Sequence, residues 1–249
     1  MTTHFRIKIF LLTVFLFHLG TAGCRKTKKP ELEILVPASL ARVAEELGTV
    51  FESNYRIAVH IREVEFSSLN CESEGGVHGD LLLCDHPDLG RVLTNQGCVS
   101  RSIPVCCTLP VVVLLKESRY QMQDIEEMPE HPELTLSVPK DSAVLRKIAE
   151  SVLPEETRFV VDADFQMSPA DFLRQSKTDA LVTWEFLAEN EKDDLQILRF
   201  PANFHAIPVE THVLTSCQNV QSCRLFIELL TSKTGTEIFK KHCFRVFSK

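Results

Sequence analysis

The sequence predicts an α/β protein that is divided into two lobes. Short buried strands alternate with amphipathic helices along most of the chain, and no internal repeat or low-complexity segment interrupts them. Hydrophobic residues make up 44% of the 249 residues, which is typical of a well-packed globule and not of a disordered chain. About 220 residues beyond the N-terminal leader are enough for one large domain or two lobes.

The N-terminal leader has the parts of an export signal. Two basic residues precede an apolar run at 9–19, which is shorter than the roughly 20 residues that cross a bilayer. Small residues then lead directly to Cys24, as in the bacterial lipobox, whose cysteine becomes lipidated. We therefore expect a signal peptide at 1–23, lipidation at Cys24 and a solvated tether at 24–30. The alternative is an ordinary signal peptide, with Cys24 as an incidental thiol.

The charge balance limits the possible partners. The chain carries a formal net charge of −7, and removal of residues 1–23, which hold two positive and no negative side chains, leaves −9. Nucleic-acid binding needs a basic face, so we expect no nucleic-acid partner. The chain has no Ser-His-Asp order, no paired-carboxylate signature and no glycine-rich phosphate loop, so we expect neither an enzyme nor a bound cofactor.

The predicted first lobe opens with a strand at 31–36, where an alternating pattern leads into an apolar run. A helical stripe of apolar residues follows at 40–51, with Ser39 at the expected N-cap. Alternation at 56–63 predicts a second strand, and the apolar run at 80–85 predicts a third.

The predicted second lobe begins at the most strand-like run in the chain, 109–115. The pattern then predicts strands at 134–138, 159–162 and 180–184, with helices at 142–153 and 169–175. A strand at 207–214 returns to the first lobe, and helices at 221–230 and 234–242 close the chain. The first lobe would thus comprise 31–107 and 209–249, and the second 108–208, with a ligand cleft between them.

Eight cysteines follow Cys24, an even number that permits disulfides in an exported chain. Eight cysteines allow 105 pairings, so the sequence leaves their connectivity open. Cys217 and Cys223 either pair or lie separately in the core, and the adjacent Cys106 and Cys107 are interpreted as packing residues. The segment Cys84-Asp85-His86 either holds a metal or simply ends a strand, and we expect no metal there.

Small hydroxyl residues stand at several strand-to-helix transitions: Ser39, Ser67 with Ser68, and Ser142. The first turn of a helix presents unpaired N–H groups and a partial positive charge. Several such ends that converge in a cleft form a neutral cage for an anion, and an acidic protein can therefore still bind one. The alternative for each serine alone is a plain helix N-cap.

The order of these segments resembles that of the periplasmic molybdate-binding proteins of ABC importers, members of the type 2 solute-binding superfamily. The similar segments include Leu35-Val36-Pro37-Ala38-Ser39-Leu40, Phe66-Ser67-Ser68-Leu69, the run 79–85, the strand 111–114, and the C-terminal stretches 226–230 and 238–244. The resemblance covers nearly all of residues 32–247. It implies two mixed sheets flanked by helices, with the ligand in the cleft between the lobes.

The resemblance also implies a function and a ligand set. The chain would be a monomeric, lipid-anchored receptor on the periplasmic face of a membrane that captures a molybdate- or tungstate-like oxyanion and passes it to the membrane subunits of an ABC importer. The ligand positions that carry over are Ser39, Ser67 or Ser68, the amides near Ser142, Ala143 and Ser168, and Trp184 in place of a tyrosine. Other ligands of the same fold, such as sulfate or a small organic anion, remain alternatives. So does a non-transport lipoprotein that acts as a sensor or as a cysteine and histidine metal module.

Overall fold

The computed structural model describes residues 31–65, 69, 71, 77–139, 142–153, 157–163, 167–201 and 206–247. The predicted signal peptide, Cys24, Ser67 and Ser68 lie outside the described residues. No helix within the described ranges is both long enough and apolar enough to cross a bilayer.

The elements of the first half of the chain, in order, are β1 (Glu31–Val36), α2 (Ala38–Tyr55), β2 (Ala58–Glu63), β3 (Leu81–Cys84), α3 (Pro87–Asn95), β4 (Val99–Thr108), β5 (Pro110–Leu115) and the 3-10 helix η2 (Ile125–Glu130). Those of the second half are β6 (Thr135–Pro139), α4 (Ala143–Val152), β7 (Arg158–Ala163), α5 (Pro169–Gln175), β8 (Ala180–Trp184), α6 (Glu185–Glu189), β9 (Leu195–Arg199), β10 (Ile207–Leu214), α7 (Val220–Leu230) and α8 (Lys233–Lys241).

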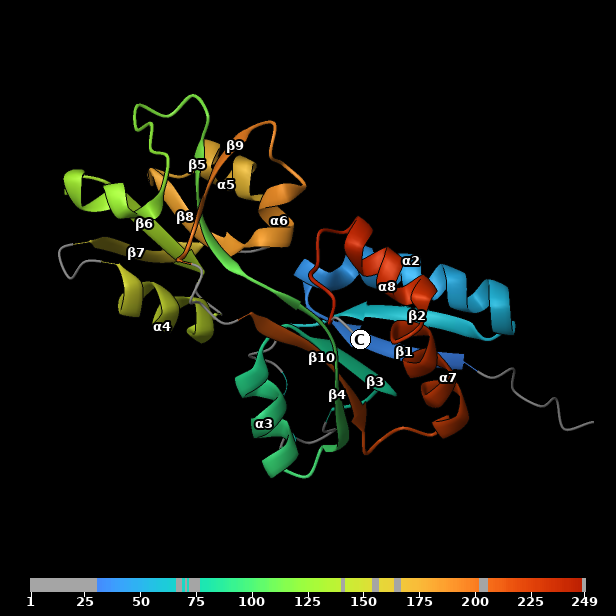
Figure 1. Cartoon of the computed structure of the whole chain (residues 1–249). Helices are drawn as coiled ribbons and strands as arrows, with labels where there is room; N and C mark the ends of the chain where they lie inside the picture. The colour runs from blue at the N-terminus through green and yellow to red at the C-terminus, as the bar shows by residue number, and fades with distance from the viewer. Residues whose placement is uncertain are drawn as a thin grey trace, which may run out of the picture. The chain divides into compact units, whose positions relative to one another are not determined.

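The first sheet has the strand order β2-β1-β3-β10-β4, in which β1 pairs in parallel with β2 and β3 while β10 runs antiparallel. Helices α2, α7 and α8 cover one face and α3 covers the other (Figure 1). Both faces of the sheet are therefore buried, which explains the continuous apolar runs of β1 and β3. In β3, Leu81 and Leu83 pack in the main core, whereas Leu82 and Cys84 pack beneath α3.

The second sheet has the order β7-β6-β8-β5-β9 and is also mixed. Its strand β5 alternates between two cores: Val112 and Leu114 belong to the core that includes α4, whereas Val111 and Val113 face α5 and α6. The predicted fold class, two mixed sheets flanked by helices, is confirmed.

The two sheets are joined where the chain passes from β4 to β5 through Leu109, and the chain returns at β10. A C-terminal segment lies at the same crossing, because Cys107 and Arg245 exchange backbone hydrogen bonds of 2.8 and 2.9 Å. The strand predicted to return at 207–214 is found in the first sheet, as expected.

Five elements were absent from the sequence prediction: α3, β4, η2, α6 and β9. Strand β4 lies at an edge of its sheet, and its first half is largely exposed, so its polar residues and Pro104 gave no strand pattern. Helix α6 and strand β9 have five residues each, too few to establish a period.

The predicted N-cap role of Ser39 was wrong. Helix α2 begins at Ala38, and its N-cap is Pro37, which makes no side-chain capping bond. Proline already has the backbone φ angle that a helix start requires, and its carbonyl accepts from the Leu40 N–H at 3.0 Å. Ser39 therefore lies within the first turn, where its hydroxyl is available to another partner.

Candidate functional site

A cavity of about 350 Å³ lies where elements attached to both sheets meet the C-terminal segment. The residues that line it are Ala38, Ser39, Arg42, Val43, Glu63, Met167, Ser168, Pro169, Phe186, Leu187, Asn190, Glu191, His242 and Phe244. Helix α2 contributes one wall, and α5 and α6 contribute another. The cavity has the size of a pocket for a small molecule, at the lower end of the usual range.

One side of the cavity is apolar. The ring of Phe186, from α6, stacks on that of Phe244, from the C-terminal segment, with centroids 4.2 Å apart and planes inclined by 22°. Val43 and Leu187 extend this surface. An apolar wall of this kind suits an organic solute better than a bare inorganic ion.

The charged residues of the cavity are of both signs. Among the described lining residues, Arg42 has the one permanent positive charge, while Glu63 and Glu191 are acidic. One oxygen of the Glu191 carboxylate is already hydrogen-bonded, since Oε2 accepts from the Ala170 N–H at 2.8 Å. A solute with an acidic group therefore finds a cation at Arg42, and hydrogen-bond donors on the solute find acceptors nearby.

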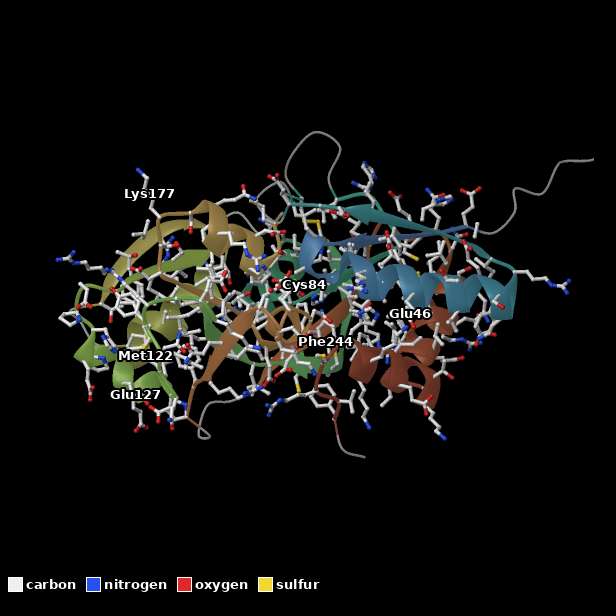
Figure 2. The ribbon with its side chains drawn as sticks, turned by 90° about the horizontal axis from the view of Figure 1, so that it is seen from above. Glu46, Cys84, Met122, Glu127, Lys177 and Phe244 are labelled. Atoms are coloured by element: carbon white, nitrogen blue, oxygen red, sulfur yellow. A yellow bond between two sulfur atoms is a disulfide. The ribbon has the colours of Figure 1, made fainter. Side chains whose placement is uncertain are left out.

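His242 is held at the cavity by Glu46 of α2, with 2.8 Å between Nε2 and Oε2. Figure 2 labels Glu46 on α2 beside the C-terminal helices, where it also accepts from Lys241 Nζ at 2.7 Å. Two hydrogen bonds lower the pKa of Glu46, and the bond from Lys241 has a larger effect than the bond from His242. This carboxylate thereby fixes the histidine and ties α2 to α8.

Ser39 lines the cavity and donates its hydroxyl proton to Asp85, with 2.9 Å between Oγ and Oδ2. Asp85 follows β3 directly, and β3 is the parallel neighbour of β1, so both residues lie at the carboxyl edge of the first sheet. Asp85 is only 2% exposed, and its Oδ1 makes no hydrogen bond of good geometry. Burial raises the pKa of Asp85, while His86, Ser39 and the Trp184 side chain oppose that shift.

Asp85 was considered from the sequence only as a possible metal ligand, and its hydrogen bond with Ser39 was not predicted. The signal was available, because polar residues that follow adjacent parallel strands meet at one edge of the sheet. Arg42, Phe186 and Phe244 were also missed. Their approach depends on how α2, α6 and the C-terminal segment pack, which no local pattern predicts.

Trp184, at the end of β8, is 1% exposed and is the largest fully buried side chain among the described residues. It does not line the cavity, but its side chain interacts with the Asp85 carboxylate. It therefore lies one layer behind Ser39. Its direct contact with a solute, which the family resemblance implies, remains a prediction.

The other predicted site residues are helix starts. Ser142 caps α4, whose first residue is Ala143, and its Oγ accepts the Leu145 N–H at 3.2 Å. Ser168 caps α5 in the same way, accepting from Asp171 N at 3.3 Å. Ser168 lines the cavity together with Ser39, whereas Ser142 does not.

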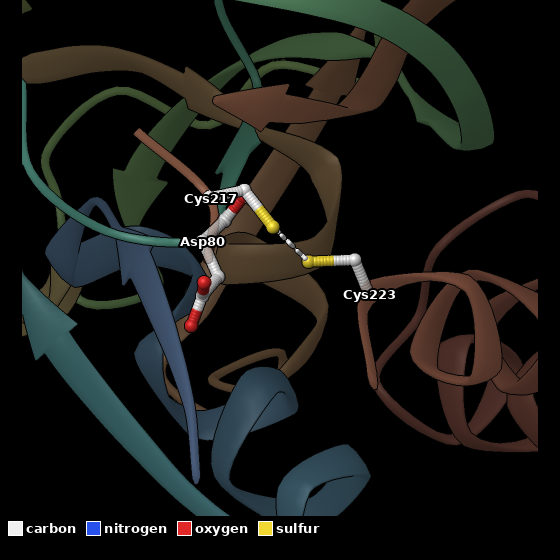
Figure 3. A group of neighbouring side chains, drawn as sticks. All are labelled: Asp80, Cys217 and Cys223. Atoms are coloured by element: carbon white, nitrogen blue, oxygen red, sulfur yellow. Dashed lines mark hydrogen bonds between the residues drawn. The ribbon is translucent and has the colours of Figure 1, made fainter. Parts of the chain in front are cut away.

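None of the described cysteines lines this cavity, although Cys243 stands between the lining residues His242 and Phe244. Cys71 and Cys98 form a disulfide. Cys84 bonds to the backbone of His86 and is buried beneath α3, which fits the interpretation of this segment as a strand end. A separate group comprises Asp80, Cys217 and Cys223, whose potential ligand atoms lie within 4.8 Å of one another (Figure 3).

The chain belongs to the family of bacterial extracellular solute-binding proteins, whose model matches residues 32–245. This membership makes it an exported solute-binding protein. No curated protein matches the chain in sequence.

Solved structures share the fold at low sequence identity. The chain is similar to the substrate-binding domain of a putative molybdenum ABC transporter from Clostridium difficile, with 16% identity and a TM-score of 0.68 over 88% of this chain and 99% of that one. It is also similar to the sulfate-binding protein SubI from Mycobacterium tuberculosis H37Rv, with 12% identity and a TM-score of 0.72 over 88% of each chain. A third similar structure is the periplasmic binding protein AfuA from Actinobacillus pleuropneumoniae with fructose-6-phosphate bound, with 14% identity and a TM-score of 0.68 over 88% of this chain and 85% of that one.

Proposed function

We propose that this protein captures a small solute with an oxyanion group in the cavity beside Ser39 and Arg42 and delivers it to an ABC importer. The observation that carries the proposal is the cavity itself, which is lined by α2 on one side and by α5 and α6 on the other. Arg42 supplies the positive charge that attracts the acidic group.

The lining of the cavity favours one class of solute over others. A molybdate- or tungstate-like ion remains a candidate, and the ligands named for two of the similar structures, sulfate and fructose-6-phosphate, also contain tetrahedral oxyanions. The stacked Phe186 and Phe244 rings and the size of the cavity favour an organic anion over a bare ion. We therefore place a small organic anion first.

The proposal extends to the parts of the chain that flank the site. The two lobes would be 31–107 with 209–249, and 108–208, so that β4, β5 and β10 connect them near the cavity. Export would use the signal at 1–23, and lipidation of Cys24 would anchor the receptor by the tether at 24–30. Mass spectrometry of membrane-extracted protein should find a diacylglyceryl adduct on Cys24, and unchanged localisation of Cys24→Ser would reject the anchor.

A ligand screen tests the proposed function. Thermal unfolding should be measured with molybdate, tungstate, sulfate, phosphate and a set of small organic anions, because a ligand that binds only the folded state raises the midpoint. At least one anion should raise the midpoint, and calorimetry should give one site per chain. Stoichiometric uptake of zinc or copper, with no response to any anion, would instead favour the metal-module alternative.

A further inference from the structure

The first inference concerns the hydrogen-bonding character of the Ser39 corner and rests on the proposed function. A serine hydroxyl has one proton to donate and two lone pairs that accept. The Ser39 proton is already given to Asp85 Oδ2 at 2.9 Å. Towards the cavity, Ser39 therefore offers only acceptor capacity.

The carboxylate behind Ser39 strengthens this character. Asp85 is almost completely buried, and one of its oxygens has no hydrogen bond of good geometry. The groups around it are His86, the Cys106 thiol of β4 and the Trp184 side chain of β8. A fully deprotonated oxyanion placed against Ser39 would meet a lone pair backed by a carboxylate, which is electrostatically unfavourable.

We propose that the solute carries an O–H group next to its acidic group, and that the Ser39–Asp85 pair accepts this O–H and selects against donor-free anions. The acidic group binds towards Arg42, and Glu63 on the same cavity provides a further acceptor. The O–H belongs either to a protonated oxyanion or to a hydroxyl on an organic acid. Sulfate and molybdate have neither at pH 8, whereas inorganic phosphate keeps one proton and a sugar phosphate keeps its hydroxyls.

Calorimetry at pH 8 with these four probes distinguishes the possibilities. Wild type should bind phosphate or fructose 6-phosphate at least about tenfold more tightly than sulfate or molybdate, since an unmatched buried polar pair costs about 1.4 kcal/mol or more. Binding by phosphate identifies the protonated oxyanion as the source of the O–H, and binding by the sugar phosphate alone identifies the hydroxyl. Asp85→Asn keeps the shape, removes the charge and adds an amide donor, so it should reduce this preference to within about threefold.

The outcomes separate the inference from the function on which it rests. Sulfate or molybdate binding to wild type as tightly as the donor-bearing probes would overturn the inference and leave the anion receptor intact. An unchanged preference in folded Asp85→Asn would also overturn it. Binding of none of the four probes, and of none of the organic anions in the thermal screen, to folded wild type would reject the oxyanion ligand itself.

An independent observation concerns Cys217 and Cys223, whose sulfurs are 3.0 Å apart (Figure 3). Cys217 precedes α7 and is partly exposed, whereas Cys223 lies in the first turns of α7 and is 2% exposed. Two thiolates on a tetrahedral zinc ion with bonds of about 2.3 Å would be about 3.8 Å apart. The Asp80 carboxylate is also already engaged, since its oxygens accept backbone N–H groups of Glu33 at 2.9 Å and Gln218 at 3.2 Å.

We infer that Cys217 and Cys223 form a second disulfide in the exported protein. The oxidant is the disulfide of a thiol oxidoreductase of the extracytoplasmic compartment. The more exposed Cys217 loses its proton and attacks that disulfide to give a mixed disulfide. Cys223 then loses its proton and attacks Cys217 Sγ, which forms the new bond and releases the oxidoreductase as a dithiol. The bond would fasten the start of α7 to the segment that follows β10.

Trypsin makes the test direct, because cleavage after Arg199 and Arg224 leaves both cysteines in one peptide, 200–224. Protein exported to an oxidising compartment and alkylated while denatured, without reduction, should give this peptide unalkylated and two hydrogens lighter than its dithiol form. The thermal midpoint of a Cys217→Ser, Cys223→Ser double variant should be about 4–8 °C below that of oxidised wild type. It should equal the midpoint of wild type in which Cys217 and Cys223 are reduced while the Cys71–Cys98 disulfide is kept. A doubly alkylated peptide, or zinc bound in place of the bond, would overturn the inference.

Discussion

Glu185, the first residue of α6, and Arg245, in the C-terminal segment, form a paired hydrogen bond in which Arg245 Nε donates to Oε2 at 3.0 Å and Nη2 to Oε1 at 3.1 Å. Arg199 Nε donates to the same carboxylate at 2.9 Å. The pair fixes Phe244 against Phe186 at the apolar side of the cavity. Glu185 thus connects the C-terminal segment with the second sheet.

Glu185→Gln should lower the free energy of unfolding by about 1–3 kcal/mol. The expected loss is modest because both arginine side chains are about half exposed, so that solvent weakens their attraction to the carboxylate. Burial would raise the pKa of Glu185, but the hydrogen bonds from Arg245 and Arg199 outweigh it and lower the pKa. The stabilisation is therefore complete above the ordinary glutamate value and is lost as the pH falls through the lowered one. Urea unfolding checks this, with Glu228→Gln of the exposed Arg224 pair as a control that should change little.

His212 should make the fold sensitive to mild acid. It is fully buried in β10, where Ser102 Oγ lies 2.8 Å from its Nδ1, and burial lowers its pKa to about 4. The pKa of this histidine is near 6.5 in the unfolded chain, so between pH 6.5 and about 4 the unfolded chain binds a proton that the folded chain does not. The free energy of unfolding therefore decreases by up to about 3 kcal/mol as the pH is lowered through this range. Urea midpoints at pH 7.5 and 5 should differ less in His212→Gln than in wild type, whereas exposed His60→Gln should keep the full difference.

Ser39→Ala should weaken solute binding about tenfold, because the cavity loses a hydrogen-bonding group next to the solute. The fold should remain, since Ser39 does not cap α2. Calorimetry should compare it with Ser100→Ala, whose hydroxyl bonds to a β10 carbonyl. Equal affinities for both variants and wild type would remove Ser39 from the site.

Trp184 should report ligand binding through its fluorescence, since it is the only tryptophan and its side chain interacts with Asp85 behind the cavity. A solute that contacts Ser39 changes the electrostatic field at the indole, so the emission should shift on saturation. Trp184→Phe should lose the signal and its interaction with Asp85 while keeping most of the packing. An unchanged emission with a solute confirmed as bound by calorimetry would assign Trp184 to the core alone.

Much of the fold was predictable because the sheets are covered on both faces. Short buried runs rich in β-branched or leucine residues, such as 81–84 and 110–115, favour central strands, and apolar stripes at helical spacing define α2 and α8. Edge strand β4 and the short α6 lacked such patterns. The site was predictable only at Ser39 and Ser168, since the approach of Arg42 and the stacking of Phe186 on Phe244 depend on tertiary packing.

Titration calorimetry of wild type and Arg42→Gln with the anion that gives the largest thermal shift tests the central claim most directly. We expect one site per chain in wild type. Binding to Arg42→Gln should be at least about tenfold weaker, because a charge-assisted hydrogen bond is lost. Binding to Arg101→Gln should be unchanged, because Arg101 lies on β4 and does not line the cavity. Equal affinity in wild type and Arg42→Gln, or the absence of any bound anion in folded wild type, would contradict the claim.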